Sequence, residues 1–91
     1  MIKTFEHTIN GQPTPFCVAL AEGPDGGARA VISTADSAKT LVVMDILGVI
    51  GSIKSALEST DDFLDRAARK AADEGLIDRA ISTGEPQQGA I

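Results

Sequence analysis

The amino-acid sequence predicts a small α+β domain, in which a short antiparallel β-meander precedes an α-helical hairpin. Residues 2–33 contain β-prone segments separated by turn dipeptides, and residues 34–58 and 60–74 space their apolar side chains as two helices do. A short C-terminal helical turn is expected after the hairpin. The chain has 91 residues, which suffices for one domain. We expect this domain to span residues 1–82, followed by a flexible tail over residues 83–91.

The meander is expected to contain two to three strands, and its first strand lies in residues 2–9. This segment is rich in Thr, Phe and Ile, which suit a pleated surface. Asn10-Gly11 follows it and is a strong turn dipeptide. Pro13 and Pro15 then withhold backbone donors. The stretch after the turn is therefore expected to be either a loop or an edge of the sheet.

The best-supported unit of the meander is a hairpin over residues 16–33. Its first arm, residues 16–21, is apolar on both faces, as in a strand that is covered from both sides. Residues 22–27 form a Gly- and Pro-containing turn cluster. Residues 28–33 then provide the returning strand.

Residues 34–58 are predicted to form the first helix of the hairpin, because their apolar side chains gather on one broad side at ~100° per residue. This stripe contains Val42, Ile46, Val49, Ile50, Ile53 and Leu57. Leu41, Met44 and Leu47 add apolar surface outside the stripe. A helix that is hydrophobic nearly all round has to be covered on every side, and one short sheet with one further helix is too little cover. The sequence therefore predicts a homodimer.

The other side of this helix carries small residues, among them two glycines. Glycine inside a helix costs ~1 kcal/mol relative to alanine, and close approach of another backbone is the usual compensation. The close neighbour is either the second helix of the same chain or a second copy of the chain, and both can hold. The predicted dimer or partner interface consists of Leu41, Met44, Asp45, Gly48, Gly51, Ser52 and Ser55.

Asp45 interrupts the apolar run and admits two interpretations. It is either an exposed residue on the polar side of the helix, or a polar group in a helix–helix seam that fixes the register of the two helices.

Residues 60–74 are predicted to form the second helix. Thr60 suits its N-cap, and Asp61 and Asp62 suit the positive end of the helix dipole. The inner stripe is narrow and rich in alanine. Gly75 is typical of a helix C-terminus, and the apolar residues after it predict one or two further helical turns.

The formal net charge is −5, and residues 59–91 account for −3 of it, with four basic and seven acidic side chains. No basic patch is present, which tells against direct nucleic-acid binding and favours a basic protein partner. One alternative function is an acidic decoy that mimics the phosphates of a nucleic acid. Its candidate acidic face consists of Asp61, Asp62, Asp65, Asp73, Glu74 and Asp78.

The chain offers little equipment for chemistry. His7 is the single histidine and Cys17 the single cysteine, so neither a metal-ligand set nor an internal disulfide can be built. A Cys–His pair would form only if their two strands align suitably. A small-ligand or enzyme site that combines these residues at a dimer interface is a second alternative. We expect no catalytic residue, no metal and no cofactor.

The sequence thus predicts a non-enzymatic interaction protein of the kind found in bacteria or phages, which acts as a regulator, an assembly factor or an inhibitor. A protein lacking a disulfide framework is expected in the cytoplasm. The longest apolar stretch, residues 40–53, is shorter than the ~20 residues that a membrane-spanning helix needs. No membrane association is therefore expected.

Overall fold

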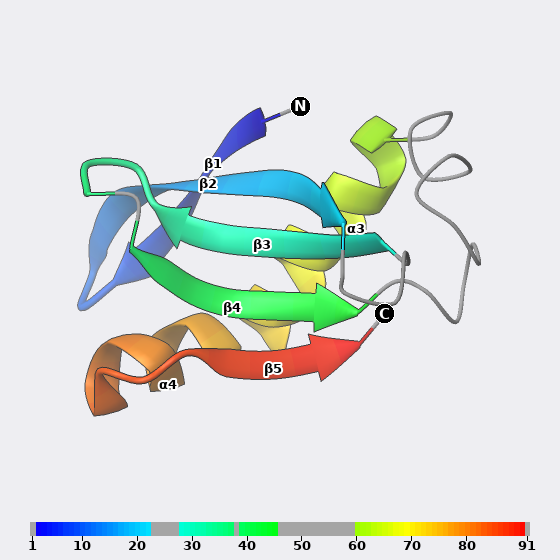
Figure 1. Ribbon diagram of the computed structural model, residues 1–91. Coiled ribbons are helices and arrows are strands. Elements are labelled where there is room, and N and C mark those ends of the chain that lie inside the picture. Colours follow the sequence, from blue (N-terminus) through cyan, green and yellow to red (C-terminus); the bar gives the residue numbers. More distant parts are fainter. Residues whose placement is uncertain (1, 23–27, 38, 46–59, 91) are drawn as a thin grey trace.

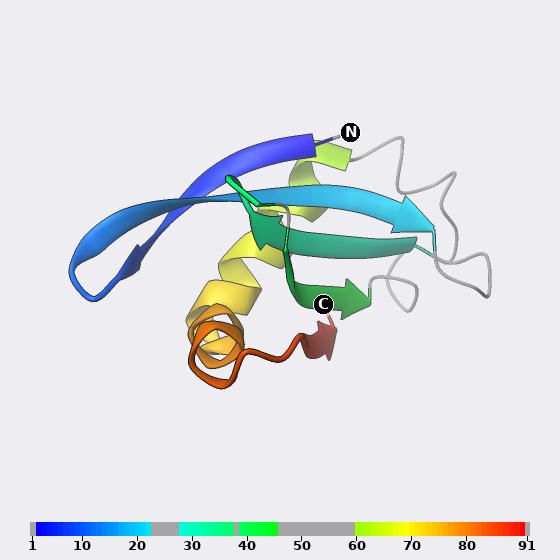
Figure 2. The same cartoon turned by 60° about the vertical axis from the view of Figure 1, so that its left-hand side comes forward.

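A computed structural model describes residues 2–22, 28–37, 39–45 and 60–90. Within these residues, five strands form one mixed sheet in the order β1-β2-β3-β4-β5, and two helices lie on the same face of it (Figures 1 and 2). The α+β class is therefore confirmed, but the predicted meander of two to three strands is wrong in its strand count, because the sheet has five. The described elements are β1 (Ile2–Ile9), β2 (Gln12–Glu22), β3 (Ala28–Thr34), β4 (Thr40–Asp45), α3 (Thr60–Asp73), α4 (Leu76–Thr83) and β5 (Gln87–Ala90).

The predicted turn between the first two strands is confirmed. Asn10 and Gly11 have φ angles of 51° and 81°, which is the left-handed backbone that a two-residue hairpin requires. The stretch after the turn is an edge rather than a loop, because β2 begins at Gln12 and pairs with β1 through both prolines. β2 pairs with β3 only from Phe16 onward, so Pro13 and Pro15 lie where β2 has a single neighbouring strand.

Alternation along the strands divides the side chains between two faces of the sheet. Phe16 and Val18 of β2 point toward the helices and are each 1% exposed. The cross-strand register places Val18 beside Ile32 of β3 and Ile32 beside Val42 of β4. Both Ile32 and Val42 are fully buried. These side chains form one core with Leu64, Ala67, Ala71, Ile77 and Ala80 of the two helices.

The predicted helix over residues 34–58 is wrong where the structure describes this segment, because residues 40–45 form β4. The run Leu41–Val42–Val43–Met44 satisfies a helical stripe and an alternating strand equally well. Pairing with β3 selects the strand, in which Val42 and Met44 are buried against the helices. Residues 46–58 of the predicted helix lie outside the described residues.

The predicted helix over residues 60–74 is confirmed as α3, and the further helical turns after Gly75 are confirmed as α4. The predicted hairpin of helices 34–58 and 60–74 is therefore wrong in its first helix, and the two described helices, α3 and α4, follow strands β1 to β4 in the chain. Together with β5 they complete a crossover that returns the chain parallel to β4.

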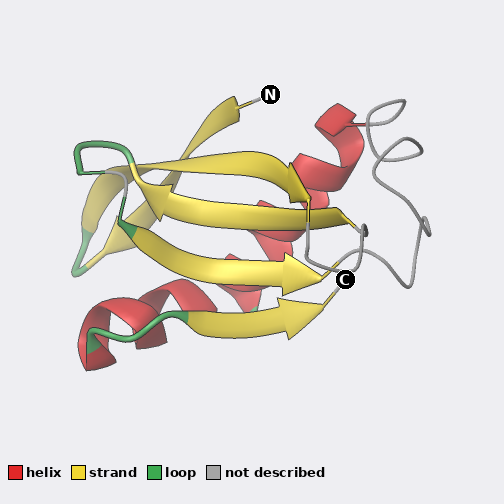
Figure 3. Cartoon of the chain, in the orientation of Figure 1, coloured by secondary structure: helices red, strands yellow, loops and turns green. Residues whose placement is uncertain are grey.

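The tail is corrected over residues 87–90, which form β5 instead of fraying (Figure 3). β5 consists of the polar and small residues Gln87, Gln88, Gly89 and Ala90, so no local propensity indicates a strand. The edge of β4 supplies the backbone partners, and Gly89 stands opposite Met44.

Candidate interaction surface

The face of the sheet turned away from the helices carries an apolar row. The register aligns Ile2 with Ala19, Ala19 with Val31, and Val31 with Val43, so these four side chains cross β1 to β4 side by side. Ile2 is 70% exposed, and the other three are half-buried. We call these four residues the open-face row. Among the described elements, both helices pack on the other face, and none lies over this row (Figure 2).

One flank of the open-face row carries an ion pair. Arg29 of β3 and Asp45 of β4 are direct cross-strand partners, with Arg29 Nη1 3.4 Å from Asp45 Oδ1. Their side chains are 21% and 47% exposed, so the contact between them is partly screened by water. Asp45 is therefore neither on the polar side of a helix nor in a helix–helix seam.

The other flank of the row is uncharged. Thr4, Cys17 and Ser33 follow one another across β1, β2 and β3 in register. Glu6 lies one step further along β1, on the same face. Within the described strands, this face carries one basic residue, Arg29, and two acidic residues, Glu6 and Asp45. The face is therefore much closer to neutral than the whole chain, whose formal charge is −5.

The interface predicted from the sequence requires correction. Leu41 and Met44 are 3% and 0% exposed in the core, so their side chains cannot contact a partner. Asp45 lies on the open face, beside the row rather than on a helix. The remaining residues of that prediction, Gly48, Gly51, Ser52 and Ser55, lie outside the described residues.

The predicted acidic face is interleaved with basic groups. Asp62, Asp65 and Asp73 are exposed on α3, on the same side as Arg66 and Arg69. The side chain of Asp61 lies outside the described part of the chain.

Three of the acidic side chains are paired. Asp65 Oδ1 is 2.9 Å from Lys3 Nζ, and Glu74 Oε2 is 3.7 Å from Lys70 Nζ. Asp78 Oδ1 is 3.1 Å from His7 Nε2. The outer side of α3 therefore carries alternating signs of charge instead of a continuous negative row, which weakens the resemblance to a chain of phosphates.

His7 and Cys17 do not meet within one chain. His7 points toward the helices, where it contacts Asp78 and lies 6.3 Å from Phe16 between ring centroids. Cys17 is a cross-strand neighbour of Thr4 and points to the opposite face. No group of three His, Cys, Asp or Glu side chains in the described part of the chain is arranged to hold a metal ion. None of the described helices is long and apolar enough to cross a bilayer.

The fold and this surface define a small α+β protein in which the two described helices lie on one side of the sheet. No family model, no curated protein and no solved structure matches the chain.

Proposed function

We propose that this chain is a non-enzymatic interaction protein that forms a homodimer through the open face of its sheet. The open-face row carries this proposal. β2 alternates Phe16 and Val18 on the helix face with Cys17 and Ala19 on the open face, so it is apolar on both sides. Strands of this composition are typical of sheets that are covered on both faces. Among the described elements, α3 and α4 cover one face only.

Charge favours a second copy of the chain as the occupant of the open face. Two chains of charge −5 repel each other. Contact through a nearly neutral face weakens this repulsion, because most acidic side chains of one copy then lie far from those of the other. The Arg29–Asp45 pair presents both signs beside the row. A surface with both signs can be complementary to itself across a two-fold axis, as an isologous interface requires.

Size points in the same direction. A domain of 91 residues buries only ~60–65% of the surface that its unfolded chain exposes, and small scaffolds of this kind gain stability by associating. Stacking two sheets face to face, ~10 Å apart, would bury the open-face row of each copy. The dimer would then act by occupying a surface of another protein, as regulators, assembly factors and inhibitors of the bacterial or phage type do.

Two observations favour this function over the alternatives. The paired and interleaved charges of α3 and α4 do not form the continuous negative surface that a nucleic-acid decoy needs. His7 and Cys17 lie on opposite faces of the sheet, so the thiol and the imidazole of one chain cannot form a Cys–His pair.

The dimer is tested by sedimentation equilibrium on the wild type and on Val31→Lys. This substitution places a charge at the centre of the row, and the side chain at position 31 points away from the core. We expect a dimeric wild type and a folded, monomeric variant. Thr8→Lys is the matched control, because it adds the same charge to the same face at the far end of β1, opposite Pro13. A wild type that stays monomeric at ~100 µM, or a Val31→Lys protein that remains dimeric, contradicts the proposal.

A further inference from the structure

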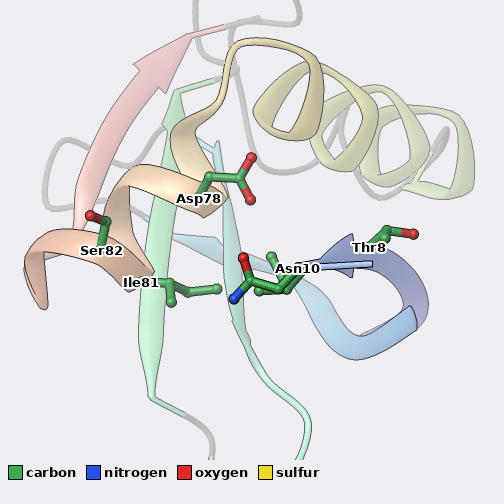
Figure 4. Close-up of a pocket in the computed structure, with 6 residues that line it drawn as sticks. Thr8, Asn10, Asp78, Ile81 and Ser82 are labelled. Atoms are coloured by element: carbon green, nitrogen blue, oxygen red, sulfur yellow. The ribbon is translucent and has the colours of Figure 1, made fainter. Parts of the chain in front are cut away.

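A cleft separates the tip of the β1–β2 hairpin from α4. Residues 12–15 of β2 pair with β1 alone, so the end of the hairpin extends past β3 as a two-stranded arm. Figure 4 shows Thr8 and Asn10 of the hairpin on one side of this space, and Asp78, Ile81 and Ser82 of α4 on the other. With Ile9, these residues line a hollow of about 420 Å³.

A second hollow of about 380 Å³ adjoins the first and shares Ile9 and Ile81 with it. Its remaining lining residues are Thr14, Pro15, Phe16, Thr34 and Asp36. Ile81 is 44% exposed, and among the described large apolar side chains only Ile2 is also exposed. We call the two hollows together the hairpin–α4 cleft. The middle of the cleft is apolar because the two hollows share Ile9 and Ile81, and each hollow contains one carboxylate.

The charges of the cleft have a single sign. Asp78 lines the first hollow and Asp36 the second, and no Lys or Arg is among the described residues that line either. Asp78 contacts His7 and keeps 59% of its side chain exposed, so a ligand can reach it. Thr8, Asn10 and Ser82 add hydroxyl and amide groups at the rim. Such a lining repels anions and favours a cation with an apolar stem.

We propose that the hairpin–α4 cleft binds an arginine or lysine side chain of a partner protein. The aliphatic stem lies across Ile9 and Ile81, and the carboxylates of Asp78 and Asp36 both attract the cationic head. This inference deepens the proposed role as an interaction protein by naming the chemistry of its partner. It does not depend on the dimer, because α4 lies on the helix face of the sheet and the open-face row lies on the other.

The test titrates ¹⁵N-labelled protein with two probes, acetyl-Leu-Arg-Leu-amide and acetyl-Leu-Glu-Leu-amide, and follows the amide resonances by NMR. We expect the arginine peptide to shift the signals of Asn10, Asp78 and Ser82, and the glutamate peptide to leave them in place. Raising the ionic strength should weaken the binding, because the carboxylates are partly exposed. Equal shifts with both peptides, or shifts that map elsewhere, overturn the proposal.

Variants assign the effect to the cleft. Asp78→Asn and Asp36→Asn should each weaken binding of the arginine peptide about fivefold, the size expected for losing one partly exposed ionic contact. Asp36→Asn leaves the His7 contact intact and so separates a charge effect from a local rearrangement. Asp62→Asn is the matched control, because it removes the same charge from an exposed position on α3 outside the cleft. Equal affinities for all three variants overturn the proposal.

The Val31→Lys protein separates this proposal from the dimer. If it is monomeric and still binds the arginine peptide, both proposals are supported. If the wild type is monomeric but binds the peptide, the dimer fails and the cleft stands. If the wild type is dimeric and no arginine peptide binds, the cleft fails and the dimer stands.

Discussion

Gly89 of β5 lies so close to Met44 of β4 that a Cβ on Gly89 would stand 2.8 Å from the Met44 sulfur. The same Cβ would stand 2.8 Å from Cδ1 of Leu76 in α4. The parallel strand β5 is thus seated where its backbone can approach the core, and Met44 and Leu76 are 0% and 6% exposed beneath it. A segment without β-prone residues becomes a strand because it fits this site.

We therefore predict that Gly89→Ala destabilises the protein. The added methyl group forces Met44 and Leu76 to move, which should lower the free energy of unfolding by ~1–2 kcal/mol in urea denaturation. Gln88→Ala is the control, because Gln88 is exposed on the other face and should change that free energy by less than ~0.5 kcal/mol. Equal stability of the two variants would show that β5 does not press on the core.

Ending the chain at Pro86 removes β5 and tests whether the C-terminus belongs to the domain. We expect the free energy of unfolding to fall by ~2 kcal/mol, since β4 loses the hydrogen bonds of one edge and the core loses its cover over Met44. A chain that ends at Ala90 serves as the control. An unchanged urea midpoint for the shorter chain would restore the flexible tail that the sequence suggests.

The outcome for β4 and β5 shows where local sequence patterns stop being informative. The turn at Asn10-Gly11 and the helix that ends before Gly75 were predictable, because each depends on backbone preferences of a few adjacent residues. Val42 and Val43 fit a helix and a strand alike, and only pairing with β3, the preceding strand, decides between them. β5 depends entirely on the edge that β4 offers.

The same limit applies to the candidate surface. A helical wheel places Leu41 and Met44 on an exposed side, whereas the strand turns Met44 into the core and Val43 outward. The open-face row is produced by the register of four strands, and this register cannot be predicted from local sequence periodicity. One part of it was visible in the sequence, because residues 16–21 are apolar on both faces.

Phe16 and Phe5 offer a matched pair for measuring the core. Their ring centroids are 5.7 Å apart on neighbouring strands, but Phe16 is 1% exposed and Phe5 is half-buried. Phe16→Ala should lower the free energy of unfolding by ~3–5 kcal/mol, a large part of the total for a domain of this size. Phe5→Ala should cost less than half of that, because its side chain is already partly hydrated. Thermal or urea unfolding of both variants measures the difference, and equal losses would contradict the assigned core.

Cys17 provides a natural reactive group on the open face, so no cysteine has to be introduced to probe that face. Its side chain points to the same face as the open-face row, on the strand that contributes Ala19. A second copy on this face would shield the thiol, so iodoacetamide should alkylate Cys17 more slowly in the wild type than in Val31→Lys. Mass spectrometry of samples quenched over time gives both rates. Thr8→Lys should react at the wild-type rate, because its added charge lies far from the row. Equal rates in the wild type and in Val31→Lys would place any dimer contact elsewhere on the molecule.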